Sequence, residues 1–181
     1  KDAVMAGKIP KSLLYKNRVM PDLRAMKLLF TLKDRSDEAV LLAIAAELQK
    51  DGINILDSMD FCSEILTPES ILTGSGISED EWKDIHFGYK MAKEIGRLDI
   101  GQTVVVKNQA VMAVEAIEGT DEAIKRGGSY ANGGAVVVKV SKPDQDMRFD
   151  VPVVGIDTLK TMIEAKASVL VLEAGKSILL Q

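Results

Sequence analysis

The chain has 181 residues, of which 46% are hydrophobic and 28% are charged, and this predicts one generous or two small globular domains and excludes a disordered chain. A net charge of −4 argues against non-specific binding to nucleic acid, which needs a broad basic surface. The single cysteine, Cys62, excludes disulfide bonds within the chain and a cysteine-based zinc site, so we expect a reducing, cytoplasmic compartment.

The first third of the chain has the pattern of alternating strands and helices. Residues 3–7 and 53–56 are apolar runs typical of short buried strands. Apolar residues at helical spacing follow Pro21, and a second helix is expected between Ser36, its cap, and Gly52, its end. Strand, helix, helix and strand in this order are typical of the last part of a doubly wound α/β domain. Because the chain opens within a strand and without Met, we expect it to be a fragment.

A stretch rich in Pro, Gly, Ser and Thr, residues 66–78, is the expected linker. It separates an N-terminal part, residues 1–65, from a C-terminal part, residues 79–181. At the end of the linker, Ser78 and Glu81 have the spacing of a capping box, which predicts a helix directly behind it.

The C-terminal part alternates strands with helices. Two strands joined by the turn residues Asn108 and Gln109 come first, and a short helix follows that Gly127 and Gly128 are expected to end. Residues 151–175 then have the pattern strand, helix, strand, which suggests a right-handed crossover. We therefore predict the α/β class, with a mixed sheet in the C-terminal domain.

A charged run precedes the strand at residue 151. Read as extended chain, residues 144–153 alternate between an apolar side and a charged side made of Asp144, Asp146, Arg148 and Asp150. One interpretation is a solvated edge strand whose ion pairs contribute little. The other is an anion and metal site. In that case Arg148, Lys139 and Lys142 would contact phosphate oxygens, and Asp150 with another carboxylate would hold Mg²⁺, which prefers oxygen ligands.

A second polar cluster surrounds the start of the helix after residue 119. Ordinary capping explains Thr120 and Asp121. Glu115 and Glu118 lie before the cap, so capping explains them less well. A third segment contains Gln102, whose amide stands at the entrance of a strand, although a plain helix-to-strand turn would also account for it.

Other chemistries find little support. His86 is the sole histidine, so the sequence offers no histidine metal cluster, and we interpret it as a surface or packing residue. The sequence has neither a GxGxxG fingerprint nor a Walker A motif, which counts against a dehydrogenase-like domain.

Four stretches carry a resemblance to a known family: "EIGRLDIGQTVVV", "VEAIEGTDEAIKR", "VVVKVSKPDQDMRFDVPVVGIDT" and "LEAGKSILL". Together they resemble the UDP-2,3-diacylglucosamine pyrophosphatases of lipid A biosynthesis, over residues 66–181. "AGKIP" and "KDGINILDS" resemble, with less specificity, the last part of that family's Rossmann-like N-terminal domain. Family members begin with a Gly-rich strand–loop–helix that this sequence lacks, which again implies a fragment.

The resemblance implies Mg²⁺-dependent hydrolysis of UDP-2,3-diacylglucosamine to UMP and 2,3-diacylglucosamine 1-phosphate, with water attacking the phosphorus on the uridine side. The family's essential aspartate lies in an R-x-D-x-P motif, which places it at Asp150, between Arg148 and Pro152. A family glutamine matches Gln145, and the E-G-T-D motif matches residues 118–121.

These assignments give a set of expected roles. An aspartate has an ordinary pKa near 3.9, so we expect Asp150 to bind metal first and to act as a general base second. The further expected Mg²⁺ ligands are Glu115, Glu118 and Asp121, and the expected substrate contacts are Gln102, Thr120, Lys139, Lys142, Gln145 and Arg148. We expect the acidic side of the run around Asp150 and the E-G-T-D turn to share one pocket.

The resemblance also bears on partners. It implies a UDP-diacylglucosamine substrate and no nucleic acid, and it allows a homodimer and a peripheral contact with the inner membrane. A non-catalytic module that binds nucleotide sugars is the alternative. Such a module would bind the UDP-sugar without the Mg²⁺-dependent release of UMP that the enzyme predicts.

Overall fold

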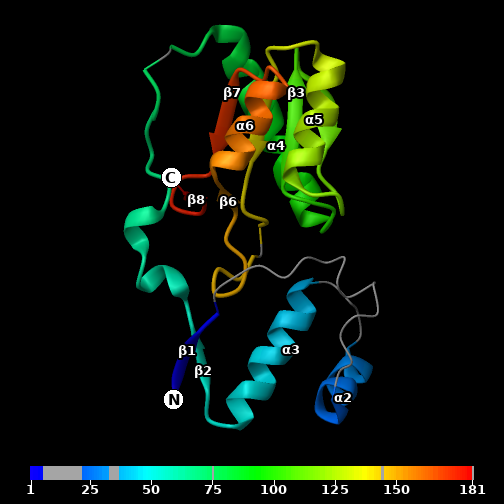
Figure 1. Ribbon diagram of the computed structural model, residues 1–181, viewed down its shortest axis with the longest axis vertical. Helices are drawn as coiled ribbons and strands as arrows, with labels where there is room; N and C mark the ends of the chain where they lie inside the picture. Colours follow the sequence, from blue (N-terminus) through cyan, green and yellow to red (C-terminus); the bar gives the residue numbers. More distant parts are fainter. Residues whose placement is uncertain (6–21, 33–36, 75, 144, 181) are drawn as a thin grey trace. The chain divides into compact units, whose positions relative to one another are not determined.

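The computed structural model describes residues 1–5, 22–32, 37–74, 76–143 and 145–180 (Figure 1). The chain forms two compact units. The first comprises residues 1–63 together with 146–150, and the second comprises residues 64–145 together with 151–181. The α/β class predicted from the sequence is confirmed, and we describe each unit by itself.

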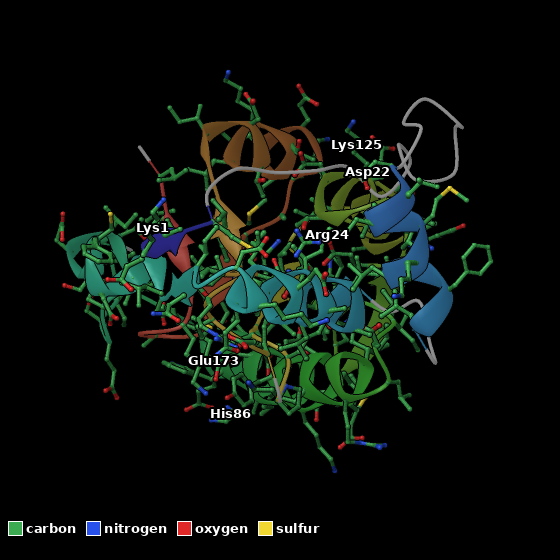
Figure 2. All side chains as sticks on the ribbon, turned by 90° about the horizontal axis from the view of Figure 1, so that it is seen from below. Lys1, Asp22, Arg24, His86, Lys125 and Glu173 are labelled. Atoms are coloured by element: carbon green, nitrogen blue, oxygen red, sulfur yellow. The ribbon has the colours of Figure 1, made fainter. Side chains whose placement is uncertain are left out.

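The first unit contains a parallel pair of short strands and two helices. Its regular elements are β1 (Asp2–Val4), α2 (Leu23–Thr31), α3 (Asp37–Lys50), β2 (Asn54–Leu56) and a 3₁₀ turn (Ser58–Asp60). Arg24 on α2, labelled in Figure 2, donates hydrogen bonds to Glu47 and Asp51, at and just beyond the end of α3, and so ties the two helices together. Gly52, with a φ of 73°, follows α3 as predicted, whereas the predicted cap Ser36 lies outside the described residues.

A four-stranded mixed sheet is the centre of the second unit. Its strands, in spatial order, are β4 (Ala110–Val114), β3 (Thr103–Lys107), β5 (Val136–Lys139) and β7 (Val169–Leu172). β5 and β7 run parallel, and the other neighbours run antiparallel, so the predicted mixed sheet is confirmed. Asn108 and Gln109 make the predicted turn between β3 and β4, both with positive φ, as a tight hairpin turn of this kind requires.

Three helices cover the two faces of this sheet. α4 (Glu79–Arg97) packs on one face, and α5 (Thr120–Ala131) and α6 (Ile156–Glu164) pack on the other (Figure 1). Alternation along the strands produces the two cores, because Val104 and Val106 face α4 whereas Val105 faces α5. The predicted capping box of α4 is present, with Ser78 and Glu81 each bonded to the other's backbone.

The predicted end of α5 at Gly127 and Gly128 is wrong, since the helix continues to Ala131. Both glycines are buried inside the helix. A Cβ added at Gly127 would lie 2.6 Å from Cβ of Val105, and one at Gly128 would lie 2.6 Å from Cβ of Ala165. These glycines therefore allow close packing of the helix on its neighbours instead of ending it.

The strand–helix–strand pattern at residues 151–175 forms, but its two strands are not paired with each other as in a simple crossover. β6 (Val153–Val154) does not pair with β7, and it pairs in parallel with β8 (Ile178–Leu179). Ile178 also forms an antiparallel bridge with Leu66. The parallel neighbour of β7 is β5, so the connection that contains β6 and α6 joins β5 to β7.

Candidate active site

One edge of the sheet in the second unit collects the polar residues of interest. β5 and β7 both end there, and Thr103, the first residue of β3, is paired with Lys139, the last residue of β5. The Glu115 N–H, directly after β4, donates to the Thr103 carbonyl over 2.9 Å. Ligands of open α/β sheets bind beyond the carboxyl ends of the strands, so this edge is where a site is expected.

Three of the predicted site residues meet at this edge. Nζ of Lys139 donates to Oγ1 of Thr120 over 2.6 Å, and the Thr120 hydroxyl donates to Oε1 of Glu115 over 2.9 Å. Lys139 is 5% exposed and Glu115 is 8% exposed. A hydroxyl group thus bridges a buried ammonium and a buried carboxylate. We call these three residues the Lys–Thr–Glu network.

The start of α5 is arranged to serve this network. Gly119, with a φ of 88°, is the cap residue, and no side chain caps the helix. Thr120 is the first helical residue, so its hydroxyl is available to Lys139 and Glu115. The amino end of α5 consequently places its partial positive charge beside the network.

Gly101 is required next to the network because the backbone comes close to Glu115. A Cβ built on Gly101 would lie 2.1 Å from the Glu115 carbonyl oxygen. The adjacent Gln102 accepts a backbone hydrogen bond from Val140. Among the described residues, Oε1 of Gln102 and Oε2 of Glu115 are buried oxygens without a hydrogen-bond partner. A buried oxygen without a hydrogen-bond partner lowers the stability of a fold. Both oxygens are also of the kind that a hard cation such as Mg²⁺ takes as ligands.

The other two acidic residues of this region have their own partners. Glu118 forms an ion pair with Arg126, which also donates to the Val114 carbonyl. Asp121 accepts a hydrogen bond of 2.8 Å from the Thr158 hydroxyl on α6. Within the described ranges, no three His, Cys, Asp or Glu side chains are grouped so that they could hold a metal ion. The metal roles of Glu115, Glu118, Asp121 and Asp150 stay predictions.

The segment after β5 uses two of the predicted substrate contacts for its own structure. Oε1 of Gln145 accepts from the Lys142 N–H over 2.7 Å, and the Gln145 N–H donates back to the Lys142 carbonyl. Nζ of Lys142 forms an ion pair with Asp99. Lys142 and Gln145 therefore close a tight turn at the point where the chain leaves the second unit.

The extended conformation predicted for residues 144–153 is wrong for residues 146–150, which form a turn. Asp146 accounts for the difference. Its side chain accepts from the Arg148 N–H and guanidinium, and its carbonyl accepts from the Phe149 and Asp150 N–H groups. An aspartate that captures nearby backbone donors in this way competes with extended structure.

The charges of this turn are coupled. The hydrogen bonds from Arg148 lower the pKa of Asp146, although partial burial acts in the opposite direction. The hydrogen bonds to Asp146 raise the pKa of Arg148, and the charge of Asp57 adds a smaller effect. Because Asp57 directly follows β2, this interaction associates the R-x-D-x-P segment with the carboxyl end of a parallel strand in the first unit.

Asp150 itself is exposed and belongs to the first unit, whereas the Lys–Thr–Glu network belongs to the second. The pocket predicted to unite Asp150 with the E-G-T-D turn stays a prediction.

Two residues that the sequence reasoning missed, Lys93 and Glu173, form an ion pair of 2.6 Å at the edge of the sheet. The available signal was the position of Glu173, a charged residue directly after the apolar strand β7.

His86 is exposed, in agreement with its interpretation as a surface or packing residue. Its Nδ1 lies 2.6 Å from the Trp82 carbonyl oxygen, one turn earlier in α4, and the two rings are 5.7 Å apart. A shallow hollow lined by Trp82, His86 and Gln109 lies at the hairpin end of the sheet, away from the Lys–Thr–Glu network. It contains none of the predicted site residues.

Two family models match the chain, and together they cover almost all of it. The model described as the LpxI C-terminal domain matches residues 68–181, and the model described as the LpxI N-terminal domain matches residues 1–65. The chain belongs to the LpxI family. The resemblance stated from the sequence is thereby confirmed.

The chain is also similar in sequence to a curated member of the LpxI family. The chain is 34% identical, over 169 residues, to the UDP-2,3-diacylglucosamine pyrophosphatase LpxI of Caulobacter vibrioides. The aligned part covers 87% of the chain and 60% of that relative. Within the part of the LpxI-family chain that the structure describes, no helix has both the length and the apolar character needed to cross a membrane.

Proposed function

We propose that this LpxI-family chain hydrolyses the pyrophosphate bond of UDP-2,3-diacylglucosamine and releases UMP and 2,3-diacylglucosamine 1-phosphate. Support comes from its family and from the activity named for a relative that is 34% identical. The structural observation that carries the proposal is the Lys–Thr–Glu network. In it, the threonine of the E-G-T-D motif is held by a buried lysine at the edge where ligands of open α/β sheets generally bind.

Lys139 and Thr120 are the residues that we assign to phosphate oxygens. A pyrophosphate carries about two negative charges that oppose attack by water, and fixed positive groups offset that charge as the transition state forms. The Lys139 ammonium and the amino end of α5 are both positive, and both stand at Thr120. Glu115 balances the charge of Lys139 through the Thr120 hydroxyl when no phosphate is bound.

Asp150 is assigned as a metal ligand before it is assigned as a base. A general base that works at neutral pH would need a pKa raised well above the ordinary 3.9, and burial is the usual cause of such a rise. Asp150 is exposed and so accessible to a cation from solution. A metal ligand, in contrast, needs only an ionised carboxylate, which is the ordinary state of an aspartate side chain at pH 7.

Mg²⁺ is part of the proposal. When bound, it would supply charge neutralisation at the pyrophosphate. Asp150 and Glu115 are the carboxylates that we assign to it, with the Gln102 amide as a further oxygen donor. The fit rests on Oε2 of Glu115 and Oε1 of Gln102, which are buried oxygens without a hydrogen-bond partner among the described residues.

Arg148 is assigned to the substrate through an exchange of partners. Its guanidinium donates through Nε and Nη2 to the two carboxylate oxygens of Asp146. A phosphate group presents a similar pair of oxygens, so Arg148 can form the same bidentate arrangement with the substrate. Because the substrate carries two acyl chains, the proposal also includes a cytoplasmic reaction with a peripheral contact at the inner membrane.

The proposal is tested by measuring UMP release from UDP-2,3-diacylglucosamine with the protein at its full encoded length. We expect release that requires Mg²⁺ and stops when a chelator is added. Asp150→Asn should reduce release to background and leave binding of the nucleotide sugar largely intact. Asp157→Asn is the matched control, because Asp157 is another exposed aspartate, with a side chain 92% exposed, and has no assigned role.

Each outcome has a clear meaning. Wild-type protein that binds the nucleotide sugar and releases no UMP would contradict the proposal and favour the non-catalytic binding module. Release that persists in Asp150→Asn at the wild-type rate would contradict the assignment of that residue. Release that is unaffected by the chelator would contradict the assigned cation.

A further inference from the structure

Glu173 is the centre of a partly buried ion-pair cluster that the reaction as proposed does not use. Its side chain is 12% exposed and is labelled in Figure 2. Oε2 accepts from Nζ of Lys93 over 2.6 Å and from the Ser141 N–H over 3.0 Å. Oε1 lies 3.3 Å from Nζ of Lys176. A carboxylate that is so well bonded fixes whatever is bonded to it.

The Lys93–Glu173 pair holds the backbone of Ser141, which lies two residues after β5. Its N–H donates to Glu173, and its carbonyl accepts from Nζ of Lys93 over 2.8 Å. Ser141 is 2% exposed, so water does not replace these bonds. The Lys93–Glu173 ion pair thus holds both the N–H and the carbonyl group of Ser141. Ser141 directly precedes the segment that begins with Lys142.

The same stretch of chain also holds the end of that segment. Glu173 begins a turn, in which its carbonyl accepts from the Lys176 N–H, and the turn leads into β8. The Ile178 N–H of β8 donates to the Pro152 carbonyl over 2.8 Å, and β8 then pairs with β6. Pro152 stands two residues after Asp150. The stretch from Glu173 to Ile178 therefore holds the chain on both sides of residues 142–151.

Glu173 does not belong to the Lys–Thr–Glu network. Leu172, the residue before it, is paired with Lys139, whose side chain faces Thr120 of α5. Because side chains alternate along a strand, Glu173 points to the opposite face, where Lys93 of α4 meets it. Any influence of Glu173 on the reaction must therefore pass through the backbone that it holds.

We propose that Glu173, paired with Lys93, is a positioning residue for Asp150, because its side chain fixes Ser141, where the chain leaves the second unit towards Asp150. Its backbone begins the turn into β8, and β8 holds Pro152, where the chain re-enters that unit. This inference rests on the proposed function, since it takes hydrolysis to depend on Asp150. A displacement of about 1 Å in a reacting group can reduce a rate about 100-fold, so loosening the hold on Ser141 should act on turnover.

The test compares two variants of Glu173 with a matched control, all at full encoded length. Glu173→Gln removes the charge, and Glu173→Asp keeps the charge but withdraws the carboxylate by about 1.5 Å, one C–C bond. The control is Asp84→Asn. Asp84 is also a buried carboxylate that accepts from backbone N–H groups, those of Asn108 and Gln109, but it does so at the hairpin end of the sheet.

We expect kcat for UMP release to fall at least tenfold in Glu173→Gln, and less in Glu173→Asp, with KM changed less than threefold in both. Asp84→Asn should lose stability in urea and keep kcat within twofold of the wild type. Unchanged kcat in both Glu173 variants would overturn the inference, and so would a loss of kcat in Asp84→Asn equal to that in Glu173→Gln.

A second readout does not depend on activity. The amide proton of Ser141 in an NMR spectrum should move upfield in Glu173→Gln, because its charged acceptor is lost, and should stay in place in Asp84→Asn. An unmoved Ser141 signal in Glu173→Gln would overturn the inference. Wild-type protein that releases no UMP would overturn the proposed function and this role with it, whereas normal turnover of both Glu173 variants would overturn the positioning role alone.

Discussion

Thr120→Val tests the Lys–Thr–Glu network with the smallest change in shape. Valine keeps the branched side chain of threonine and removes the hydroxyl. The Lys139 ammonium then loses an acceptor at 2.6 Å, and the Glu115 carboxylate loses a donor at 2.9 Å. Both charged groups are nearly fully buried, so water cannot easily take the place of the hydroxyl.

The size of the effect follows from these two bonds. A hydrogen bond to a charged group contributes about 1.5–3 kcal/mol to stability, so two contribute roughly 3–6 kcal/mol. Lys139 has a further interaction, and Thr120 is half-buried, which both reduce the loss. We expect the free energy of unfolding to fall by about 2–4 kcal/mol. At roughly 4 °C for each kcal/mol in a domain of this size, Tm should fall by about 8–16 °C.

The assay is urea and thermal unfolding of the wild type, Thr120→Val and the control Thr161→Val. Thr161 is also nearly buried, but among the described residues its hydroxyl bonds only to the Asp157 carbonyl of its own helix, over 3.0 Å. The control should therefore lose less than about 1 kcal/mol. In UMP release, Thr120→Val should show a kcat about 100-fold lower, as for loss of one donor to a developing charge. Equal stability loss in the two variants would refute the reasoning.

Two further predictions concern packing and pH. Gly127→Ala should destabilise the second unit by about 1–3 kcal/mol in urea unfolding, because its Cβ would lie 2.6 Å from Val105, and a change below about 0.5 kcal/mol would contradict this contact. Burial raises the pKa of Glu173, but hydrogen bonds from Lys93 and Ser141 outweigh burial, so the pKa is lowered overall. A lowered pKa stabilises the fold above the ordinary value of about 4.5, and that stability is lost as the pH falls further towards the folded value. The difference in unfolding free energy between the wild type and Glu173→Gln should therefore shrink as the pH falls from 6 to about 3.5, and a constant difference would show that the charge of Glu173 does not stabilise the fold.

Local sequence signals predicted those elements whose causes are local. The capping box of Ser78 and Glu81 and the tight turn at Asn108 and Gln109 both form as expected. In each case the side chains or backbone angles of adjacent residues determine the structure, so the sequence contains the necessary information.

The errors arose where distant or competing contacts decide the outcome. Gly127 was expected to end a helix. It instead lies inside the helix, because Val105 of the sheet leaves no room for a side chain at this position. Residues 146–150 were expected to be extended, but Asp146 bonds to the groups two to four residues ahead and makes a turn. Alternation of residue types could not distinguish that turn from a strand.

The candidate site divides in the same way. Motifs identified Thr120, Glu115 and Lys139 as separate candidates, and the pairing of β3, β4 and β5 brings them together. Glu173 and Lys93 were missed, since neither lies in a motif and their sequence separation of 80 residues hides the ion pair. A rule that inspects charged residues directly after apolar strands would have found Glu173.

The central claim is that this chain cleaves a pyrophosphate bond by attack of water, in a reaction that depends on Asp150. Its most direct measurement is hydrolysis of UDP-2,3-diacylglucosamine in ¹⁸O-labelled water by the wild type and by Asp150→Asn, with the label located by mass spectrometry. We predict one labelled oxygen in UMP, none in the sugar phosphate, and no product from the variant. Label in the sugar phosphate, or labelled UMP formed equally fast by Asp150→Asn, would contradict the account.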